Sequence, residues 1–203
     1  MAVYNRKDSY YKKAKREGYK SRAAYKLAEL NNRFKIIKKG SVILDCGAAP
    51  GGWSQVALEI IGQSGKVVAV DLNEITGINN PNFIGIVGDF TKNETLDRVL
   101  AVSNLYDTVI SDIAPHTIGI RDADHLNSLE LVSLVYEFTK KVLKPNGCFL
   151  FKLFEGNERQ GFVNKLKKNF RDVKIVRPDA TRSGSVEIYV AAFGYVKAEE
   201  SNA

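Results

Sequence analysis

The sequence predicts an α/β fold in which a mostly parallel sheet is covered by helices on both faces. Two observations carry this prediction. Short apolar runs of strand length alternate with longer segments whose apolar residues recur at helical spacing. The short runs are apolar almost throughout, which is typical of strands buried on both faces of a parallel sheet. The chain of 203 residues is long enough to bury a substantial core, and we expect one domain over residues 1–203.

The first 40 residues are a basic extension. They hold 13 Lys and Arg residues against 3 Asp and Glu, a net charge of +10, whereas the remaining residues hold 17 against 20. This concentration of positive charge favours a polyanionic partner such as RNA, although a lysine-rich arm can also serve solubility alone. Tyrosines among these charges can stack on unpaired bases or fasten the arm to the core. They are Tyr4, Tyr10, Tyr11, Tyr19 and Tyr25.

Two helices are predicted within this extension, residues 1–40. A short basic helix over residues 8–17 ends before Gly18, and Ser21 can cap a second helix. On the second helix Arg22 and Lys26 lie four residues apart and therefore share a face. The residues of that helix expected to face the core are Ala24, Leu27, Leu30 and Phe34.

A glycine-rich loop follows the first strand of the predicted catalytic core, residues 41–196. The apolar run 42–44 ends at Asp45, and residues 46–52 (Cys-Gly-Ala-Ala-Pro-Gly-Gly) lead into a helix. Strand, glycine-rich loop and helix open nucleotide-binding α/β units, in which the ligand lies against the helix N-terminus. Glycines let the backbone approach a ligand closely, although such a loop can also be a tight connection that binds nothing. The apolar stripe of the helix comprises Val56, Ala57, Ile60 and Ile61.

Three further strands close on an acidic residue. They are residues 66–71 with Asp71, residues 82–87 with Asp89, and residues 107–112 with Asp112. Helices are expected over residues 94–102 and 124–143, and Pro145-Asn146-Gly147 is expected to end the longer one.

The end of the chain breaks the alternation of strand and helix. A buried strand is predicted over residues 148–154 and a helix over residues 162–170. The last two strands, residues 173–176 and 186–195, have no helix between them. Since a short connection joins antiparallel neighbours, this pattern predicts a hairpin that adds one antiparallel strand.

The acidic strand ends predict a cofactor site, because the carboxyl ends of parallel strands lie along one edge of a sheet, where ligands bind. Asp71 follows the glycine loop by about 20 residues, the separation at which a carboxylate reaches ribose hydroxyls. This spacing also fits NAD, but the loop is not G-x-G-x-x-G, and Pro50 removes a backbone donor that a pyrophosphate would use. Asp89 and Asp112 would repel phosphates and attract a sulfonium cation. S-adenosylmethionine is therefore the cofactor that fits better.

Lys152 is the leading catalytic candidate. It lies in an aromatic and aliphatic strand, where a charged side chain is costly unless it is paired. Near the end of the strand it can also reach solvent. Asp112 ends a candidate neighbouring strand. In the last strand, alternation places Glu187 and Tyr189 on one face, so Glu187 is a carboxylate in an otherwise apolar segment.

Taken together, these segments resemble the FtsJ family of RNA ribose 2′-O-methyltransferases over nearly the whole chain, residues 8–195. The matching stretches are residues 21–27, 45–55, 71–72, 88–90, 111–115, 152–154 and 187–189. The resemblance implies a class I (Rossmann-like) methyltransferase with a seven-stranded, mostly parallel sheet, one antiparallel strand and helices on both faces. The family's catalytic tetrad of Lys, Asp, Lys and Glu falls on Lys26, Asp112, Lys152 and Glu187.

The resemblance also implies binding residues, a cofactor and a substrate. Residues that would bind S-adenosyl-L-methionine are Gly47, Pro50, Gly51, Gly52, Trp53, Asp71, Asp89 and Asp112, although Trp53 can equally anchor the core. Residues that would track RNA phosphates are Lys12, Lys13, Lys15, Arg16 and Arg22. Lys152 would orient or deprotonate the ribose hydroxyl. The implied substrate is a uridine of large-subunit (23S-type) rRNA, within an assembled subunit; tRNA anticodon loops are the alternative.

Proteins of other classes remain to be weighed. A nicotinamide-dependent oxidoreductase is disfavoured by the loop and the basic arm, and a non-catalytic RNA-binding module has no need of lysines set among carboxylates. A DNA base methyltransferase would carry a Pro-Pro-aromatic motif, which residues 112–115 lack. His116 and His125 form no metal-binding pattern, so we expect no metal and assign them loop or capping roles.

The composition of the sequence indicates the cellular compartment in which the protein is expected. No apolar run approaches the roughly 20 residues needed to cross a bilayer, and the N-terminus has no apolar signal core. Cys46 and Cys148 both lie in apolar, strand-like segments, which favours two buried free thiols over a disulfide. We therefore expect a cytoplasmic protein, acting as a monomer on RNA.

Overall fold

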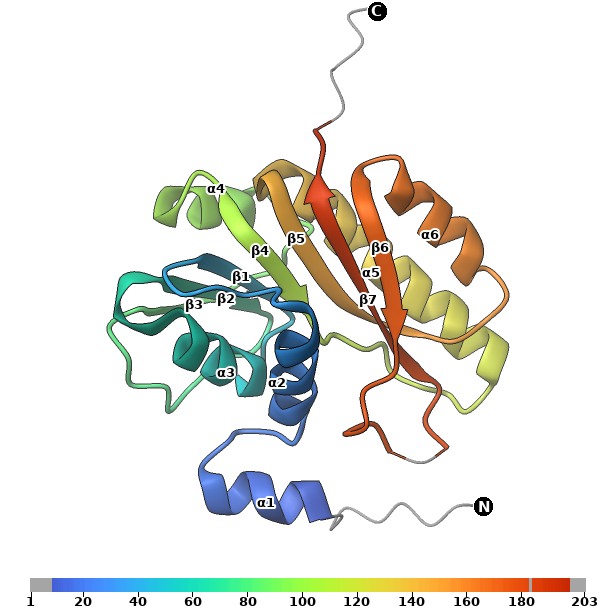
Figure 1. Ribbon diagram of the computed structural model, residues 1–203, viewed down its shortest axis with the longest axis horizontal. Coiled ribbons are helices and arrows are strands. Elements are labelled where there is room, and N and C mark those ends of the chain that lie inside the picture. The colour runs from blue at the N-terminus through green and yellow to red at the C-terminus, as the bar shows by residue number, and fades with distance from the viewer. Residues whose placement is uncertain (1–8, 183, 198–203) are drawn as a thin grey trace, which may run out of the picture.

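A seven-stranded sheet with the strand order β3-β2-β1-β4-β5-β7-β6 forms the centre of the molecule (Figure 1). The computed structural model describes residues 9–182 and 184–197. The strands are β1 (Val42–Cys46), β2 (Lys66–Asp71), β3 (Phe83–Val87), β4 (Tyr106–Ser111), β5 (Leu143–Phe154), β6 (Phe170–Val176) and β7 (Glu187–Tyr195). The chain order reverses direction between β1 and β4, and such a switch point opens a crevice at the carboxyl ends of the strands.

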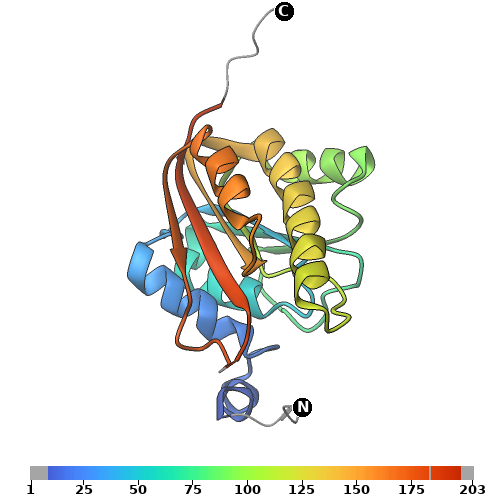
Figure 2. The same ribbon diagram turned by 90° about the vertical axis from the view of Figure 1, so that its right-hand side faces the viewer.

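Helices cover both faces of this sheet, as Figure 2 shows edge-on. They are α1 (Ser9–Glu17), α2 (Ala23–Phe34), α3 (Gly52–Ile61), α4 (Asn93–Val102), α5 (Arg121–Val142) and α6 (Arg159–Lys167), with a 3₁₀ turn η1 (Gly62–Ser64) after α3. Helices α2 and α3 pack on one face through Leu27, Leu30 and Val56. Helices α4, α5 and α6 pack on the other through Val99, Val135 and Phe162.

The strands at the β6 edge carry the one change of direction. Strand β7 pairs antiparallel with both β5 and β6, whereas β1, β2, β3, β4 and β5 pair in parallel. Because β7 runs against the others, its first residue, and not its last, lies at the edge where the parallel strands end. The predicted α/β fold with one antiparallel strand is confirmed.

Three local predictions are wrong in detail. Ser21 does not cap α2: the residue before the helix is Arg22, in the right-handed helical region and with no side-chain cap. The predicted helix over 162–170 begins and ends earlier, because Phe170 is buried and pairs with Tyr195 as the first residue of β6. The strand predicted over 148–154 begins earlier, directly after α5 ends at Val142, since Leu143 already pairs with Tyr106 in β5.

The two cysteines are free thiols, as predicted, but they differ in burial. Cys46 is fully buried in β1, whereas Cys148 is half-buried in β5. The predicted burial of Cys148 is therefore only partly met. Among the described helices, none is both long and apolar enough to cross a membrane.

Candidate active site

The glycine loop after β1 is held tightly by its neighbours. Gly47 has a φ of +71°, and its backbone N–H donates to the carbonyl of Val70 at 2.8 Å. A Cβ atom at Gly47 would lie 2.7 Å from Ile113, in the loop after β4. Gly51 has a φ of +108°, and its Cβ would meet Ile78 at 2.8 Å. Both positions therefore need glycine, for the dihedral angle and for the close approach.

A small pocket of about 150 Å³ opens beside this loop. It is lined by Ser21, Ala23, Asp45, Gly47, Ala48, Ala49, Pro50, Trp53 and Asp112. Four of the predicted cofactor residues therefore meet here: Gly47, Pro50, Trp53 and Asp112. The remaining ones, Gly51, Gly52, Asp71 and Asp89, lie outside the lining that the described residues form.

Asp45 gives this pocket an unusual carboxylate. The side chain is 1% exposed, its Oδ2 accepts a hydrogen bond from the Ser54 hydroxyl at 2.6 Å, and its Oδ1 has no partner within the described part of the chain. The pKa of Asp45 is raised from the usual 3.8 to about 7: desolvation is the largest cause, the Ser54 hydrogen bond opposes it, and the charges of Asp112 and Asp71 add to it. A buried carboxyl with a free oxygen suits a cationic ligand better than a phosphate.

Asp71 and Asp89 lie at the same sheet edge, and their carboxylates accept hydrogen bonds from neighbouring loop residues. The Asp71 carboxylate accepts hydrogen bonds from the backbone N–H of Ala49 at 2.9 Å and of Asn73 at 2.8 Å, so it braces the glycine loop. The Asp89 carboxylate accepts from the backbone N–H and the hydroxyl of Thr91, and the first of these hydrogen bonds does most to lower the pKa of Asp89. Asp71 therefore contacts the glycine loop, whereas the hydrogen bonds of Asp89 stay within the turn that it begins.

Trp53 is buried where α2 and α3 meet. The side chain is 3% exposed, and its indole N–H donates to the carbonyl of Ala23 at 2.9 Å. Its ring lies 5.8 Å from that of Tyr189. It therefore anchors α2 to α3, and at the same time it lines the small pocket.

The four predicted tetrad residues form one hydrogen-bonded cluster. Lys152 lies 3.0 Å from Asp112 Oδ1 and also donates to the Asp112 carbonyl. Lys26 donates to Glu187 Oε2 at 2.6 Å and to the Tyr189 hydroxyl at 2.9 Å. The Tyr189 hydroxyl in turn donates to Asp112 Oδ1 at 2.7 Å. Tyr189 thus joins the two lysine–carboxylate pairs.

The sheet register explains why residues so distant in sequence meet. Lys152 pairs with Tyr189, and Phe154 pairs with Glu187, along the antiparallel β5–β7 ladder. Asp112 directly follows β4, which is the parallel neighbour of β5. The end of β4, the end of β5 and the start of β7 therefore lie at one edge. The role of Tyr189 was not predicted, although alternation had placed it on the same face as Glu187.

The two lysines of the cluster are nearly closed to solvent, with Lys26 6% and Lys152 7% exposed, whereas the side chains of Asp112 and Glu187 are 19% and 25% exposed. Desolvation acts to raise the pKa of Glu187, but the ammonium groups of Lys26 and Lys152 outweigh it and leave that pKa below its usual range. Desolvation and the charges of Asp112 and Glu187 raise the pKa of Tyr189 well above its usual value. Tyr189 is therefore a neutral phenol at physiological pH, able to accept from Lys26 while it donates to Asp112.

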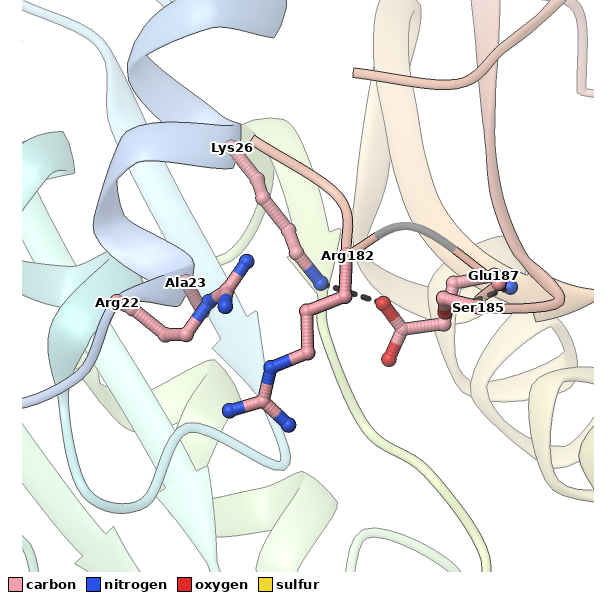
Figure 3. A pocket seen from close by; sticks show the side chains of 7 residues that line it. Arg22, Ala23, Lys26, Arg182, Ser185 and Glu187 are labelled. Atoms are coloured by element: carbon pink, nitrogen blue, oxygen red, sulfur yellow. Dashed lines mark hydrogen bonds and ion pairs between the residues drawn. The ribbon is translucent and has the colours of Figure 1, made fainter. Parts of the chain in front are cut away.

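A larger pocket of about 450 Å³ adjoins the tetrad (Figure 3). Its lining includes Arg22, directly before α2, and Lys26 of α2, together with Arg182 and Ser185 from the loop before β7 and Glu187 at the start of β7. Arg22 and Lys26 share this pocket, as their spacing predicts. The guanidinium carbon of Arg22 also lies 5.7 Å from the centroid of the Tyr10 ring on α1, the helix that carries the other predicted RNA-binding residues. Arg182 was not predicted.

Those other residues lie on α1, which Figure 1 shows at the lower end of the molecule, below α2. They are Lys12, Lys13, Lys15 and Arg16, and all four are exposed. Tyr10 and Tyr19 both pack against Tyr25, and the Tyr19 hydroxyl donates to Glu59 of α3 at 2.9 Å. These tyrosines therefore fasten the arm to the core. Tyr4 lies outside the described residues.

The histidines divide between two settings. His116 is exposed in the loop after β4, as predicted. His125 is fully buried within α5, with Nδ1 2.8 Å from the Phe154 carbonyl and Nε2 3.1 Å from Glu158, so its predicted loop or capping role is wrong. In the described part of the chain, no group of three or more His, Cys, Asp or Glu side chains is arranged to hold a metal ion.

Known proteins share both the fold and the sequence. A crystal structure of a protein of Plasmodium falciparum, named as a ribosomal RNA methyltransferase, superposes with a TM-score of 0.78 at 31% identity, over 87% of this chain and 98% of that one. Fibrillarin of Aeropyrum pernix, in complex with S-adenosyl-L-methionine, superposes with a TM-score of 0.60 at 18% identity, over 83% and 75% of the two chains, and is similar in fold alone. The fold and the site define a Rossmann-like methyltransferase.

The sequence comparisons give the family. The model of the FtsJ-like methyltransferases matches residues 19–195, and this chain belongs to that family. Proteins named ribosomal RNA large subunit methyltransferase E are similar over most of their length. That of Methanothermobacter thermautotrophicus is 48% identical over 91% of this chain and 88% of its own, and that of Hahella chejuensis is 43% identical over 93% and 91%. Membership of a methyltransferase family decides against a nicotinamide-dependent oxidoreductase.

Proposed function

We propose that this protein transfers a methyl group from S-adenosyl-L-methionine to the 2′-hydroxyl of a ribose in large-subunit rRNA, with a uridine as the acceptor nucleoside. The observation that carries the proposal is the position of the tetrad. Asp112 belongs both to the lining of the 150 Å³ pocket beside the glycine loop and to the cluster with Lys152, while Lys26 and Glu187 line the 450 Å³ pocket. One set of side chains thus joins the small pocket beside the glycine loop to the larger pocket.

The chemistry of the small pocket supports S-adenosyl-L-methionine. Asp45 and Asp112 supply carboxylates, and one oxygen of Asp45 is unsatisfied among the described residues. The cofactor carries a sulfonium and an ammonium group, which such carboxylates would stabilise. Gly47 would let the methionine part approach the backbone, and Asp71 holds the loop in shape. When bound, this cofactor supplies an electrophilic methyl group.

Lys152 would act on the ribose hydroxyl. A hydroxyl is a weak nucleophile, and methyl transfer needs an in-line approach, so positioning contributes much of the rate. Asp112 fixes the position of the Lys152 amine through its carboxylate and its carbonyl. As the hydroxyl oxygen forms its new bond to carbon, its proton passes to Nζ of Lys152 in the neutral form. Lys26, held by Glu187 and Tyr189, places a second positive charge beside this centre.

The basic arm would bind RNA phosphates through Lys12, Lys13, Lys15 and Arg16, with Arg22 closer to the site. The names of the relatives support large-subunit rRNA as the substrate class. We propose that residues 1–203 act as one methyltransferase domain, with residues 1–40 as its basic extension. The protein would work as a cytoplasmic monomer on the assembled ribosomal subunit.

The substrate is tested by offering two RNAs in parallel. Large ribosomal subunits and bulk tRNA, both from cells that lack this protein, are incubated with labelled S-adenosyl-L-methionine and the purified enzyme. The proposal predicts label in the large-subunit RNA and none in tRNA. Label in tRNA alone would transfer the proposed function to the anticodon-loop alternative.

A further inference from the structure

The 450 Å³ pocket is built from two segments that are far apart in the sequence. Its lining, among the described residues, comes from α2 with the residue before it, and from the loop between β6 and β7 with the first residue of β7. The first segment contributes Arg22, Ala23 and Lys26, and the second contributes Arg182, Gly184, Ser185 and Glu187. Figure 3 shows the side chains of the two segments facing each other across the pocket. The shape of the pocket therefore depends on how this loop is placed against α2.

Three polar side chains on one face of α2 hold the second segment. Arg22, Lys26 and Glu29 follow one another at intervals of four and three residues, which places them on the same side of the helix. The Lys26 ammonium donates to Glu187 Oε2 at 2.6 Å. The Arg22 guanidinium donates to the carbonyl of Ala180. Glu29 contacts the same stretch of chain as these two side chains do.

The Glu29 carboxylate binds two consecutive backbone N–H groups of the loop. Oε1 accepts from the N–H of Asp179 at 2.9 Å, and Oε2 accepts from the N–H of Ala180 at 3.2 Å. The next N–H, that of Thr181, donates to the carbonyl of Pro178 at 3.0 Å, so these residues form a turn. Ala180 is 2% exposed, and an unpaired N–H at such a buried residue is costly. Glu29 therefore satisfies this turn and ties it to α2.

The small pocket beside the glycine loop is independent of this contact. Among the described residues, its lining includes none from the loop between β6 and β7. Its buried carboxylate, Asp45, is held by Ser54 of α3, and Asp71 of β2 holds the glycine loop at Ala49. Displacement of the loop before β7 would therefore alter the larger pocket and leave the small one intact. A change at Glu29 should separate the two sites.

We propose that Glu29 is a positioning residue for the acceptor RNA: it holds the loop between β6 and β7 against α2 and thereby sets the shape of the larger pocket. This inference rests on the proposed function, in which the acceptor ribose lies beside the tetrad. Glu29 lies outside the lining of both pockets and acts through the loop, which also leads to Glu187 beside Lys26. Without Glu29 the loop is docked only part of the time. Acceptor RNA that binds the docked form then binds with an affinity reduced by that fraction.

The test measures steady-state methyl transfer to large ribosomal subunits by the wild type, Glu29→Ala, Glu29→Gln and two control variants. Glu130→Ala removes the same side chain from an exposed position of α5. Tyr106→Phe removes a buried hydroxyl that donates to the carbonyl of Val99 at 2.8 Å, so it lowers stability without altering the lining of either pocket. Thermal melting of each variant reports its stability.

Glu29→Ala should raise KM for the subunits by about tenfold and leave kcat nearly unchanged, since saturating RNA draws the loop back to its docked position. Its affinity for S-adenosyl-L-methionine, measured by calorimetry, should equal that of the wild type. Glu29→Gln should give an intermediate KM, because its amide keeps one oxygen acceptor. Tyr106→Phe should lower the melting temperature at unchanged KM, and Glu130→Ala should match the wild type. A wild-type KM in folded Glu29→Ala, or a fall in kcat alone, would overturn the positioning role.

Amide hydrogen exchange keeps the two proposals distinct. In Glu29→Ala the N–H groups of Asp179 and Ala180 should exchange faster by about tenfold than in the wild type, while those of α3 keep their rates. An active wild type whose Glu29→Ala variant has a normal KM would remove the positioning role and keep the proposed function. A wild type that shows the Glu29-dependent protection but transfers no methyl group to subunits or tRNA would remove the proposed function, and the acceptor role of Glu29 with it.

Discussion

Replacing Asp45 by Asn should stabilise the protein in a pH-dependent way. Burial raises the pKa of Asp45 from the usual 3.8 to about 7, so the folded state holds the proton more tightly than the unfolded chain does. The carboxyl group is neutral in both states at low pH. As pH rises from about 4 to about 7, the unfolded state ionises first, and the folded state progressively loses stability relative to it.

The size of the effect follows from the shift. Three pKa units correspond to about 4 kcal/mol at high pH, at 1.36 kcal/mol per unit. Part of this loss has already occurred near pH 5, where the carboxyl of the unfolded chain is mostly ionised. The free energy of unfolding of Asp45→Asn minus that of the wild type should therefore grow by ~2.5 kcal/mol between about pH 5 and about pH 8. Asn keeps an oxygen to accept the Ser54 hydrogen bond, so that hydrogen bond does not change with pH.

Urea denaturation at the two pH values measures this difference. Trp53 is the one tryptophan of the chain and is buried, so its fluorescence reports unfolding. Ser54→Ala is the matched control: it removes the hydrogen bond that lowers the pKa of Asp45, and should make the loss of stability with pH larger. A difference between Asp45→Asn and wild type that stays constant from pH 5 to pH 8 would refute the reasoning.

Three further predictions concern the tetrad, the arm and the loop. Lys152→Ala should lower the rate of methyl transfer by about a hundredfold or more, because the variant lacks the amine that positions and deprotonates the hydroxyl. Calorimetry should find that its affinity for S-adenosyl-L-methionine is nearly unchanged. Near-normal turnover would remove Lys152 from the reaction. Replacing Lys12, Lys13, Lys15 and Arg16 together by Gln should reduce the slope of log RNA affinity against log salt by about 0.7–0.9 for each phosphate that these side chains neutralise. The control variant, with Gln at the exposed Lys167 and Lys168, should keep the wild-type slope. Equal slopes for the two variants would remove α1 from the RNA site. Gly47→Ala should lower the free energy of unfolding by more than Gly18→Ala does. Both glycines have positive φ, which costs an alanine about 1–2 kcal/mol, but only at Gly47 would the new Cβ also meet Ile113, at 2.7 Å. Equal losses in urea denaturation would mean that the Ile113 side chain moves aside without a cost in stability.

The sheet was predictable because its strands are apolar runs bounded by acids and glycines. Strand β2 was predicted to the residue, and the antiparallel β7 followed from the missing helix after β6. Boundaries that depend on tertiary pairing could not be read from local patterns. Phe170 suits a helical stripe as well as a strand, and its pairing with Tyr195 decides for the strand. Ser21 has the chemistry of a helix cap, but it packs against α3, where a Cβ at Gly52 would lie 2.2 Å from its hydroxyl oxygen.

The site was predictable where chemistry is unusual for its setting. Lys152 in a buried strand and Glu187 in an apolar one are costly residues, and the structure pairs both with opposite charges. Tyr189 was harder to assign, because a tyrosine in a strand is ordinary, and its bridging hydrogen bonds depend on the β5–β7 register. Arg182 lies in a loop without periodicity, so only the docking of that loop on α2 brings it to the pocket.

The most direct test of the central claim is the position of the transferred methyl group within the nucleotide. Large-subunit RNA labelled by the wild-type enzyme is hydrolysed with alkali, which requires a free 2′-hydroxyl to cleave the adjoining phosphodiester. The account predicts that the label stays in an alkali-resistant dinucleotide with uridine at the methylated position, and that Lys152→Ala yields none. Label released as a mononucleotide methylated on its base would contradict ribose methylation and the role of the tetrad together.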